Sequence, residues 1–401
     1  MATQAEIKQR YAEWQEHCKR IQSLTDLSSF SHETAVQKEK RIRRLQNDYA
    51  AFCEYYFPHF LQLRDKVTGE VIRTVHNAPF HNAAAMKVKS TPNLKAVFKW
   101  PRGHAKSTHF DIFIPLWLMF QPKRLINFMV VVGKSEDSAI RLLGDIQAEL
   151  EYNQRIIADF GEQKSIGEWS EGEFTSRQGV KFLACGRGQS PRGLREREAR
   201  PDYIVIDDLD DDELCRNEAR VKILTDWVKE ALFGALDVGR GRFIMVGNLI
   251  SKKSVLANIA ASKGVHVSEI KAVDKNGEPV WKEKWTKEEA LQYREFVGYR
   301  AWEKEMMHNP ITDGTIFRAE WIRFKKVLPL WKYDMLVCYT DPSFKSTTAN
   351  DYKASRLWGK IGTELHLIDC YVRQDSVTGM VRWLYNLYED LPEGVARSEE
   401  H

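Results

Sequence analysis

The run Lys106-Ser107-Thr108 carries residue types that bind the phosphate groups of a nucleotide. In the pattern GxxxxGK[ST], backbone N–H groups cradle phosphates, the lysine reaches the β- and γ-phosphates, and the hydroxyl binds Mg²⁺. Here the stretch is WPRGHAKST, so Trp100 and Ala105 stand where the pattern has its two glycines. A surface lysine that happens to precede a serine is therefore an alternative interpretation.

We interpret the stretch as a deviant phosphate loop, because a strand pattern precedes it and a helix pattern follows it. Gly103 provides flexibility, and Arg102 adds a second cation that can face phosphate. Ala105 costs little if its backbone keeps a negative φ, and a positive φ at this residue would count against the interpretation as an ATP site. The predicted ATP-binding residues of this loop are Arg102, Gly103, His104, Ala105, Lys106, Ser107 and Thr108, with Lys106 also catalytic.

Paired carboxylates follow a β-branched strand pattern in YIVIDDLDDDE, residues 203–213. We predict that Asp207 holds Mg²⁺, directly or through water, and that Asp208 orients and deprotonates the attacking water. A buried strand that ends in a solvated acidic loop is the alternative. The separation from Lys106 leaves room for an intervening strand and helix, which favours one shared site.

Two further stretches could complete such a site. GRGQSPRGLREREARPD, residues 186–202, is rich in arginine, and Arg192, Arg195 and Arg197 are candidates for an arginine finger that stabilises charge on the transferred phosphoryl group. An exposed basic loop is the alternative. RFIMVGN, residues 242–248, ends in Gly247 and Asn248, where a polar side chain could sense the γ-phosphate.

The elements that must position these residues alternate between strand and helix patterns. Strands are predicted at 94–100, 125–133, 180–186, 203–208 and 242–248, and helices at 107–120 and 135–153, the second with Ser135 as N-cap. This alternation predicts an α/β fold with a mostly parallel sheet and helices on both faces. Three tightly connected strands at 333–343, 353–362 and 364–372 and a helix at 376–390 then indicate a new domain.

Composition is that of a soluble globular protein, with 43% hydrophobic and 29% charged residues. The net charge of +4 does not by itself indicate nucleic-acid binding. Basic residues gather at Lys38–Arg44, either as a solvated helix face or as a contact to nucleic acid or a partner subunit. The six cysteines form no CxxC pair, the start is polar, and the longest apolar run is short. We expect reduced thiols and neither a signal peptide nor a membrane span.

The order of these motifs resembles the large terminase subunit of tailed bacteriophages. A deviant loop with arginine ahead of AKS precedes an apolar strand into paired acids and then a GN strand end. WEKEMMHNPITDGTIFRAEWI follows and resembles that family's linker into its nuclease, ahead of a strand that ends in Asp341. The resemblance covers residues from about 50 to 375. Each motif is weak, and the ordered set is specific.

The resemblance implies a P-loop (RecA/ASCE-like) ATPase domain followed by the start of an RNase H-like nuclease domain. The expected boundaries are a helical N-terminal region at 1–75, the ATPase domain at 76–265, a helical linker or lid at 266–330 and an incomplete nuclease domain at 331–401. Large terminases dock on a procapsid portal, hydrolyse ATP to push double-stranded DNA inside, and cut that DNA. The implied partners are DNA, the portal protein, the small terminase subunit and further copies in a ring, in the host cell cytoplasm.

The resemblance also assigns roles to residues. The phosphate loop of the family is matched by Lys106, Ser107 and Arg102, and its Mg²⁺ acid is matched by Asp207. Its coupling motif is matched by Gly247 and Asn248. Asp208 stands where many members have a catalytic glutamate. NAPFHNAAAMK lies where the family grips adenine, with Phe80 or His81 as candidates. Asp341 matches the first nuclease acid, for Mg²⁺ or Mn²⁺. Asp351 is a second ligand or a turn residue.

Three functions remain open at this stage. The first is a DNA-translocating ATPase of the terminase type whose nuclease looks truncated and inactive, because the expected later acids are missing. A helicase-like ATPase would share the loop and the acids, but should continue into a second motor domain. A non-catalytic remnant that only binds DNA or portal would tolerate the missing glycines, although the set of Lys106, Ser107, Asp207 and Asp208 argues against decay.

Overall fold

The computed structural model describes residues 4–28, 32–65, 68–189, 200–311, 322–341 and 352–391. Packing divides the chain into two compact units, residues 1–319 and 320–401. This division falls inside 266–330, the segment expected to be a helical linker. The expected boundaries at 75 and 265 stay predictions.

A central sheet organises the first unit. Within the described residues it has eight strands in the order β10-β3-β9-β8-β4-β7-β6-β5. Their bounds are β3 (Lys95–Lys99), β4 (Phe128–Gly133), β5 (Trp169–Ser170), β6 (Glu173–Thr175), β7 (Lys181–Gly186), β8 (Tyr203–Asp207), β9 (Arg242–Gly247) and β10 (His266–Glu269). The pairs from β10 across to β7 are parallel, and β6 and β5 add an antiparallel edge.

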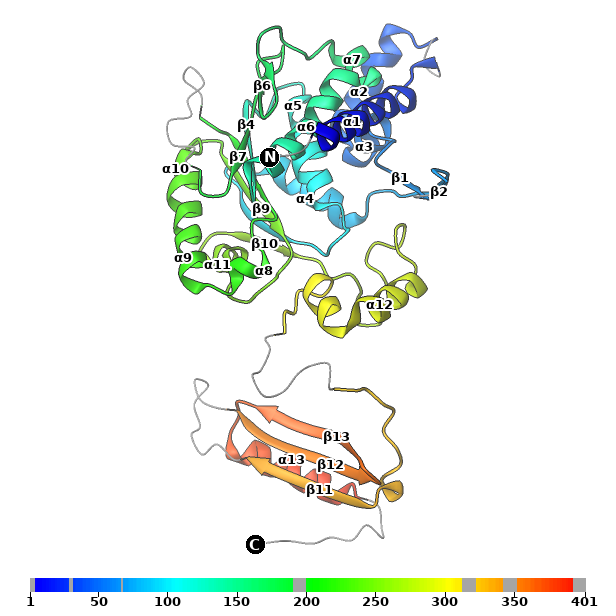
Figure 1. Ribbon diagram of the computed structural model, residues 1–401, viewed down its shortest axis with the longest axis vertical. Helices are drawn as coiled ribbons and strands as arrows, with labels where there is room; N and C mark the ends of the chain where they lie inside the picture. Colours follow the sequence, from blue (N-terminus) through cyan, green and yellow to red (C-terminus); the bar gives the residue numbers. More distant parts are fainter. Residues whose placement is uncertain are drawn as a thin grey trace. The chain divides into compact units, whose positions relative to one another are not determined.

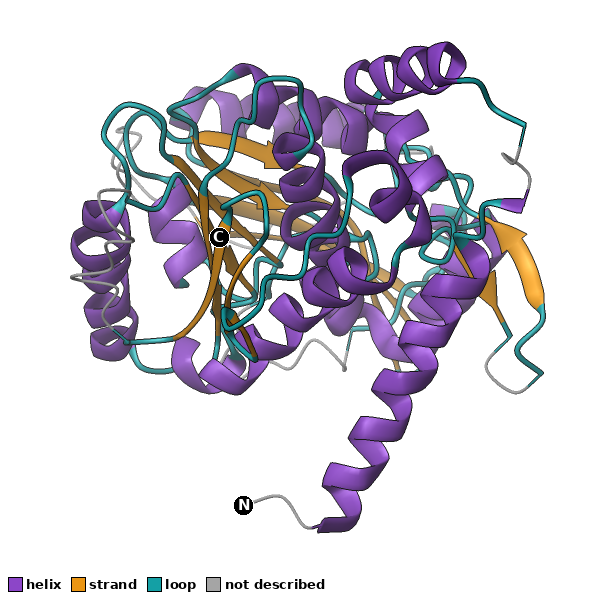
Figure 2. Cartoon of the chain, turned by 90° about the horizontal axis from the view of Figure 1, so that it is seen from above, coloured by secondary structure: helices purple, strands orange, loops and turns teal. Residues whose placement is uncertain are grey.

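The central strands are apolar on both faces, as a parallel sheet covered by helices requires. Every residue of β4, β8 and β9 is buried. Alternate residues of each strand enter two separate apolar clusters, so that Val205 of β8 packs on one side of the sheet and Ile206 on the other. The parallel sheet with helices on both faces that the sequence predicted is confirmed (Figures 1 and 2).

Different helices cover the two faces of the sheet. On one face lie the π-helical turn η2 (Thr108–Phe113), α5 (Ile114–Met119), α6 (Glu136–Tyr152) and α7 (Gln154–Phe160). On the other lie α8 (Asp212–Cys215), α9 (Glu218–Trp227), η3 (Val228–Leu232), α10 (Phe233–Ala235) and α11 (Val255–Ala260). Figure 1 shows α9 and α11 on the side of the strands opposite α5 and α6.

The N-terminal residues add helices to the face that carries α5 and α6. These are α1 (Gln4–Leu24), α2 (Ala35–Asn47), α3 (Tyr49–Tyr56) and α4 (Pro79–Ser90), with the hairpin strands β1 (Gln62–Arg64) and β2 (Val71–Thr74) between α3 and α4. Thr34 caps α2 and Ser135 caps α6, and each hydroxyl accepts a hydrogen bond from the backbone N–H three residues on. The predicted N-cap at Ser135 is confirmed.

After β10 the chain passes through turns and irregular backbone up to Thr286 before a helix begins, and the helical linker or lid expected at 266–330 stays a prediction. Helix α12 (Lys287–Glu305) begins at a capping box of Thr286 and Glu289. Gly298 interrupts it with φ of 80° and ψ of 161°, so α12 consists of two helical stretches joined at a glycine. A glycine adopts this positive φ without the steric cost that a Cβ would add.

The second unit contains the predicted antiparallel strands and helix. After the 3₁₀ turn η5 (Leu330–Lys332), strands β11 (Met335–Asp341), β12 (Lys353–Ile361) and β13 (Glu364–Arg373) pair in sequence order, and α13 (Val377–Glu389) follows. Across the described residues of both units, no helix has the length and apolarity needed to cross a bilayer.

A buried charge cluster joins the N-terminal helices to α7. The Asp159 carboxylate accepts hydrogen bonds from Arg41 at 2.5 and 3.0 Å and from the Tyr56 hydroxyl at 2.7 Å. Its side chain is 1% exposed, and Arg41 also contacts Glu33. Removing one partner of a buried ion pair leaves the other charge without compensation.

We predict that Asp159→Ala lowers the free energy of unfolding of the first unit by about 3 kcal/mol, measured by urea denaturation. The matched control is Glu39→Ala, which removes the exposed pair with Arg43 one helical turn away on α2. That control should change stability by less than about 0.5 kcal/mol. Equal effects of the two substitutions would show that the buried cluster contributes no more to the free energy of unfolding than the exposed ion pair does.

Candidate active site

The predicted site residues meet where the carboxyl ends of three adjacent parallel strands come together. β3 leads into the phosphate loop, β8 ends at Asp207, and β9, which lies between them, ends at Gly247. The helix after β3 packs on one face of the sheet, whereas α11 after β9 packs on the other. Open α/β sheets bind ligands at such a switch point, since the loops diverge and leave a crevice.

Lys106 extends across this crevice. Its ammonium donates hydrogen bonds to the carbonyls of Trp100 and Pro101 at 3.1 and 3.2 Å and to Asn248 Oδ1 at 2.6 Å. The side chain is 8% exposed. Burial lowers the pKa of Lys106, and the charges of Asp208 and Asp207 act in the opposite direction. The ammonium is thus surrounded by oxygen acceptors, which are the atoms that phosphate would replace.

The backbone of the loop takes a conformation that alanine disfavours. Ala105 has φ of 58°, so the condition of a negative φ is not met, and this conformation counts against the interpretation as an ATP site. Gly103 has φ of 73°. The chain turns through the left-handed region directly before Lys106, where the pattern GxxxxGK[ST] has a glycine that would adopt it freely. Ala105 adopts it against a cost of about 1 kcal/mol.

Ser107 and Asp207 are in direct contact, although they lie on different strand–helix connections. The Ser107 hydroxyl donates to Asp207 Oδ2 at 2.6 Å, while Asp207 Oδ1 is buried without a hydrogen-bond partner. Asp207 is 5% exposed. Burial, and then the charge of Asp208, raise the pKa of Asp207. An acceptor oxygen left open in a buried place is suited to a cation.

Asp208 leaves the strand in a left-handed conformation, with φ of 43°. Aspartate is among the few non-glycine residues that adopt this region with some frequency. Its N–H donates to the Val246 carbonyl at 3.2 Å, and its side chain is exposed. Consecutive carboxylates therefore differ: Asp207 is buried against Ser107, and Asp208 is open to solvent, where a water molecule can reach it.

Asp111 is a site residue that sequence reasoning missed. It lies in the π-helical turn η2, four residues after Ser107, and is 1% exposed. Neither carboxyl oxygen of Asp111 has a partner at regular hydrogen-bond geometry. The charged side chain that interacts most strongly with Asp111 is Asp207. Burial, and then Asp207, raise the pKa of Asp111 well above its usual range. Only its position as a lone acid in the apolar run HFDIFIPLWLMF could have signalled it.

The π turn explains how Asp111 reaches Asp207. One extra residue per turn changes the direction of the following side chains, and single π turns often occur at functional sites. Phe110 and Phe113 of the same turn are buried in the core. The helix therefore packs its aromatic side chains against the sheet and still directs one carboxyl toward the strand end.

The side chains at this strand end fit a divalent cation bound together with phosphate. The Ser107 hydroxyl and the open Asp207 oxygen are hard oxygen ligands, and Asp111 lies behind them. Among the described residues, no group of three His, Cys, Asp or Glu side chains is arranged to hold a metal alone.

Gly247 and Asn248 contact both sides of the crevice. A Cβ on Gly247 would lie 2.9 Å from Leu256 Cδ1, so the end of that side chain on α11 would have to shift, and it would be in ordinary contact with Asp208 Oδ1 at 3.5 Å. Asn248 accepts from Lys106 and donates through Nδ2 to Glu305 Oε2 at 2.6 Å. The Glu305 contact was not predicted.

The remaining loop residues lie around Lys106. Arg102 is exposed, and its N–H donates to the Glu305 carbonyl at 3.1 Å. The His104 ring is buried with Nδ1 bonded to the Arg102 carbonyl at 3.1 Å, and burial lowers the pKa of His104 to about 3. Thr108 begins the π turn. Lys284, from the segment before α12, donates to the Gly103 carbonyl.

The predicted adenine-binding residues belong to an aromatic cluster beside the loop. Phe80 is partly buried, with its ring 4.9 Å from Trp100 and 6.4 Å from Trp281. His81 is fully buried; one ring nitrogen bonds the Ala78 N–H at 2.9 Å and the other bonds the His104 carbonyl at 3.1 Å. Both nitrogens of His81 are engaged, so Phe80 is the more accessible of the two.

The three candidate finger residues, Arg192, Arg195 and Arg197, lie outside the described residues. Arg187 of that stretch, and Arg177 before it, are paired with acids. Arg187 donates to Asp211 at 3.0 Å and to the Leu209 carbonyl at 3.3 Å, and Arg177 lies 3.2 Å from Glu162. Arg187 therefore ties the start of the arginine-rich stretch to the acidic loop that follows Asp208.

Of the predicted nuclease residues, Asp341 is the last residue of β11 and is exposed, opposite Ala354 of β12. Asp351 lies outside the described residues. The placement at a strand end matches the prediction for Asp341, and its role as a metal ligand stays a prediction.

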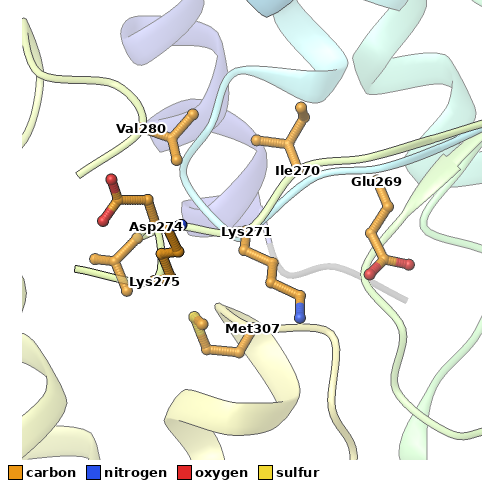
Figure 3. A pocket seen from close by; sticks show the side chains of 8 residues that line it. Glu269, Ile270, Lys271, Asp274, Lys275, Val280 and Met307 are labelled. Atoms are coloured by element: carbon orange, nitrogen blue, oxygen red, sulfur yellow. The ribbon is translucent and has the colours of Figure 1, made fainter. Parts of the chain in front are cut away.

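A separate hollow lies near the end of α12. It has a volume of about 430 Å³ and is lined by Glu269, Ile270, Lys271, Val273, Asp274, Lys275, Val280 and Met307 (Figure 3). Figure 3 shows Lys271 and Met307 facing the same open space. None of the predicted phosphate-site residues lines it, so it is distinct from the crevice around Lys106.

We predict that Ala105→Gly raises the free energy of unfolding by about 1 kcal/mol, because glycine adopts φ near 60° without strain. Urea denaturation measures the change. The control is Ala158→Gly in helix α7, where glycine should lower stability by about 1 kcal/mol. A destabilised Ala105→Gly protein would show that the loop does not hold a left-handed residue at this position in solution.

We also predict a pH-dependent effect of Asp111→Asn. Because the pKa of Asp111 is raised in the folded chain, the folded state keeps a proton that the unfolded state loses above pH about 4, and stability falls as pH rises. Asparagine removes this penalty, so the variant should gain on the wild type between pH 5 and 8, by at most about 1.4 kcal/mol per pH unit. A difference that is constant over this range would contradict a protonated Asp111.

Comparisons with known proteins give solved structures only. No family model matches the sequence, and no curated protein matches it. The chain is similar to the large terminase of the thermophilic bacteriophage D6E, with 12% identity over 77% of this chain and 74% of that one and a TM-score of 0.38. The same terminase in complex with ATP-gamma-S has 10% identity over 79% of this chain and 74% of that one, with a TM-score of 0.38. The large terminase of bacteriophage HK97 has 13% identity over 82% of this chain and 67% of that one, with a TM-score of 0.42. These similar structures are all bacteriophage large terminases.

Proposed function

We propose that this chain is an ATP-hydrolysing motor of the large-terminase type, which drives double-stranded DNA into a procapsid. The observation that carries the proposal is the convergence of Lys106, Ser107, Asp207, Asp208 and Asn248 at one switch point of a parallel sheet, with Ser107 bonded to Asp207 at 2.6 Å. The order of motifs and the helical segment after the sheet support the same assignment.

Each side chain has a distinct task in phosphoryl transfer. The Lys106 ammonium exchanges its carbonyl and amide acceptors for phosphate oxygens and neutralises the charge that builds on them. Asp208, exposed at the strand end, orients the attacking water and accepts its proton. Asp208 is a methylene shorter than glutamate, and its backbone is left-handed, with φ of 43°.

Ser107 and Asp207 would hold a magnesium ion that accompanies the nucleotide. When bound, this ion supplies positive charge to the β- and γ-phosphate oxygens. The chain prepares the place by keeping one Asp207 oxygen open and by fixing the other on the Ser107 hydroxyl. Asp111 is buried beside Asp207 and interacts with it.

Further parts of the proposal come from the resemblance. The adenine would be contacted by Phe80 or His81. One of Arg192, Arg195 or Arg197 would act as the arginine finger. In a nuclease domain, metal would be bound by Asp341 together with Asp351. DNA, the portal protein, the small terminase subunit and further copies of the chain are the proposed partners, in the cytoplasm of a phage-infected host.

A second candidate is a remnant of such a motor that binds DNA or portal without turnover. One observation favours it: Ala105 holds a strained conformation in a loop that normally has glycine there. A helicase-like ATPase would use the same residues. The described part of residues 320–401 is an antiparallel meander with a helix, which differs from the parallel sheet of a second motor domain.

We predict that the protein hydrolyses ATP, that double-stranded DNA stimulates the rate, and that Lys106→Ala reduces turnover by at least about 100-fold. Steady-state phosphate release measures all three. The matched control is Lys134→Ala, because Lys134 also lies in a Gly-Lys-Ser sequence between a strand and a helix, yet it is exposed and Ser135 serves as helix cap. That variant should retain full activity.

The outcomes separate the candidate functions. Turnover that depends on Lys106 and rises with duplex DNA, without strand separation, supports the packaging motor. Strand separation favours the helicase-like alternative. Neither ATP binding nor turnover, with an intact fold by circular dichroism, would favour the remnant and reject the motor.

A further inference from the structure

The side chain of Asn248 has its two ends committed to opposite partners. Its amide oxygen accepts from the Lys106 ammonium at 2.6 Å, and its amide nitrogen donates to Glu305 Oε2 at 2.6 Å. Because the nitrogen can donate only where it points, the Glu305 carboxylate fixes the orientation of the amide. A chain of hydrogen bonds thus runs from the phosphate loop through the end of β9 to the end of α12.

Glu305 and a bound phosphate would satisfy the same groups. A residue at the Asn248 position can sense the γ-phosphate only by donating from its N–H₂ group, and one of the two hydrogens of that group is already donated to Glu305. Lys106 likewise can bind phosphate only after it leaves acceptors such as Asn248 Oδ1. Both the carboxylate and the phosphate are anions, so they also repel each other in a crevice of limited solvent access.

We infer that Glu305 is a positioning residue that competes with the nucleotide phosphate for Asn248, so that nucleotide binding releases Glu305 and the end of α12. This inference rests on the proposed function and adds to it a residue that links the phosphate site to the helical segment. Glu305 contacts Asn248 by a hydrogen bond, and its charge also acts directly on Lys106.

The surroundings of Glu305 allow this release. Its carbonyl accepts from the Arg102 N–H at 3.1 Å, so Glu305 contacts the loop by its backbone and Asn248 by its side chain. Two residues on, Met307 borders the hollow of about 430 Å³ (Figure 3). Before it in the sequence, Gly298 interrupts the helix. The stretch between Gly298 and Met307 therefore has a break at one end and open space at the other.

The test compares three variants of the 401-residue chain by calorimetric titration with the β,γ-imido analogue of ATP in the presence of Mg²⁺. Glu305→Ala should bind the analogue about tenfold more tightly than wild type, since a competing anion is removed. Glu305→Gln keeps an acceptor for Asn248 without the charge, so its affinity for the analogue should lie between those of wild type and Glu305→Ala. Glu303→Ala is the matched control, because Glu303 lies on the same helix and contacts Asn309 instead of the site; it should bind like wild type.

Hydrogen exchange provides the second readout. In wild type, the analogue should speed exchange of the amides at 299–308, whereas in Glu305→Ala exchange should be fast already and unchanged by the analogue. A residue that merely supports the fold would weaken nucleotide binding when it is removed, which is the opposite direction.

The results distinguish this inference from the proposed function. Binding by wild type that is lost in Lys106→Ala, with equal or weaker binding by Glu305→Ala, would overturn the competition and leave the motor intact. Slower exchange at 299–308 in wild type on binding would also overturn it. No binding by wild type or by Glu305→Ala would reject both.

Discussion

The hydrogen bond from Ser107 to Asp207 is the contact on which the site depends. It joins residues from two strand–helix connections that are separated by a third strand, β9. The bond can form only if all three strands are parallel and end at the same level, because a shift in register would carry the carboxylate away from the loop. The buried apolar faces of β8 and β9 enforce that register.

Around this bond, the chain buries charges that would be unstable alone. Lys106, Asp207 and Asp111 lie at the same strand ends, and burial shifts the pKa of each toward its neutral form. Isolated charges in such a place cost several kcal/mol, and their mutual attraction offsets only part of this. Strain at Ala105 and Asp208 adds to the cost. The extensive core on both sheet faces supplies the compensating stability.

The sequence predicted the fold well where patterns are strong. Long apolar runs such as 125–133 and 242–248 became buried strands, and the capping serine of α6 was recognised. The edge strand β10, His266–Glu269, was missed because half-exposed edge residues carry little apolar signal. For the site, the loop and the acid pair were recognised from residue types that phosphate chemistry needs. Asp111 and Glu305 were missed because only folding brings them to the site, through a π turn and through a helix two hundred residues after the loop. The φ of Ala105 could not be predicted, since alanine adopts negative φ almost everywhere and only the closed loop imposes the exception.

The interruption at Gly298 divides α12 into two pieces that are anchored to different parts of the molecule. The first piece is held through Glu289, which pairs with Arg73 of the β2 strand, and the second through Lys304 and Glu305, which reach Asp212 and Asn248. An unbroken helix would act as a rigid rod and force both anchors to move together. With a joint in the middle, a displacement at the second anchor need not reach the first. The lever arm available to any motion that starts at the phosphate is then the short piece between Gly298 and Glu305, about 10 Å at 1.5 Å per residue.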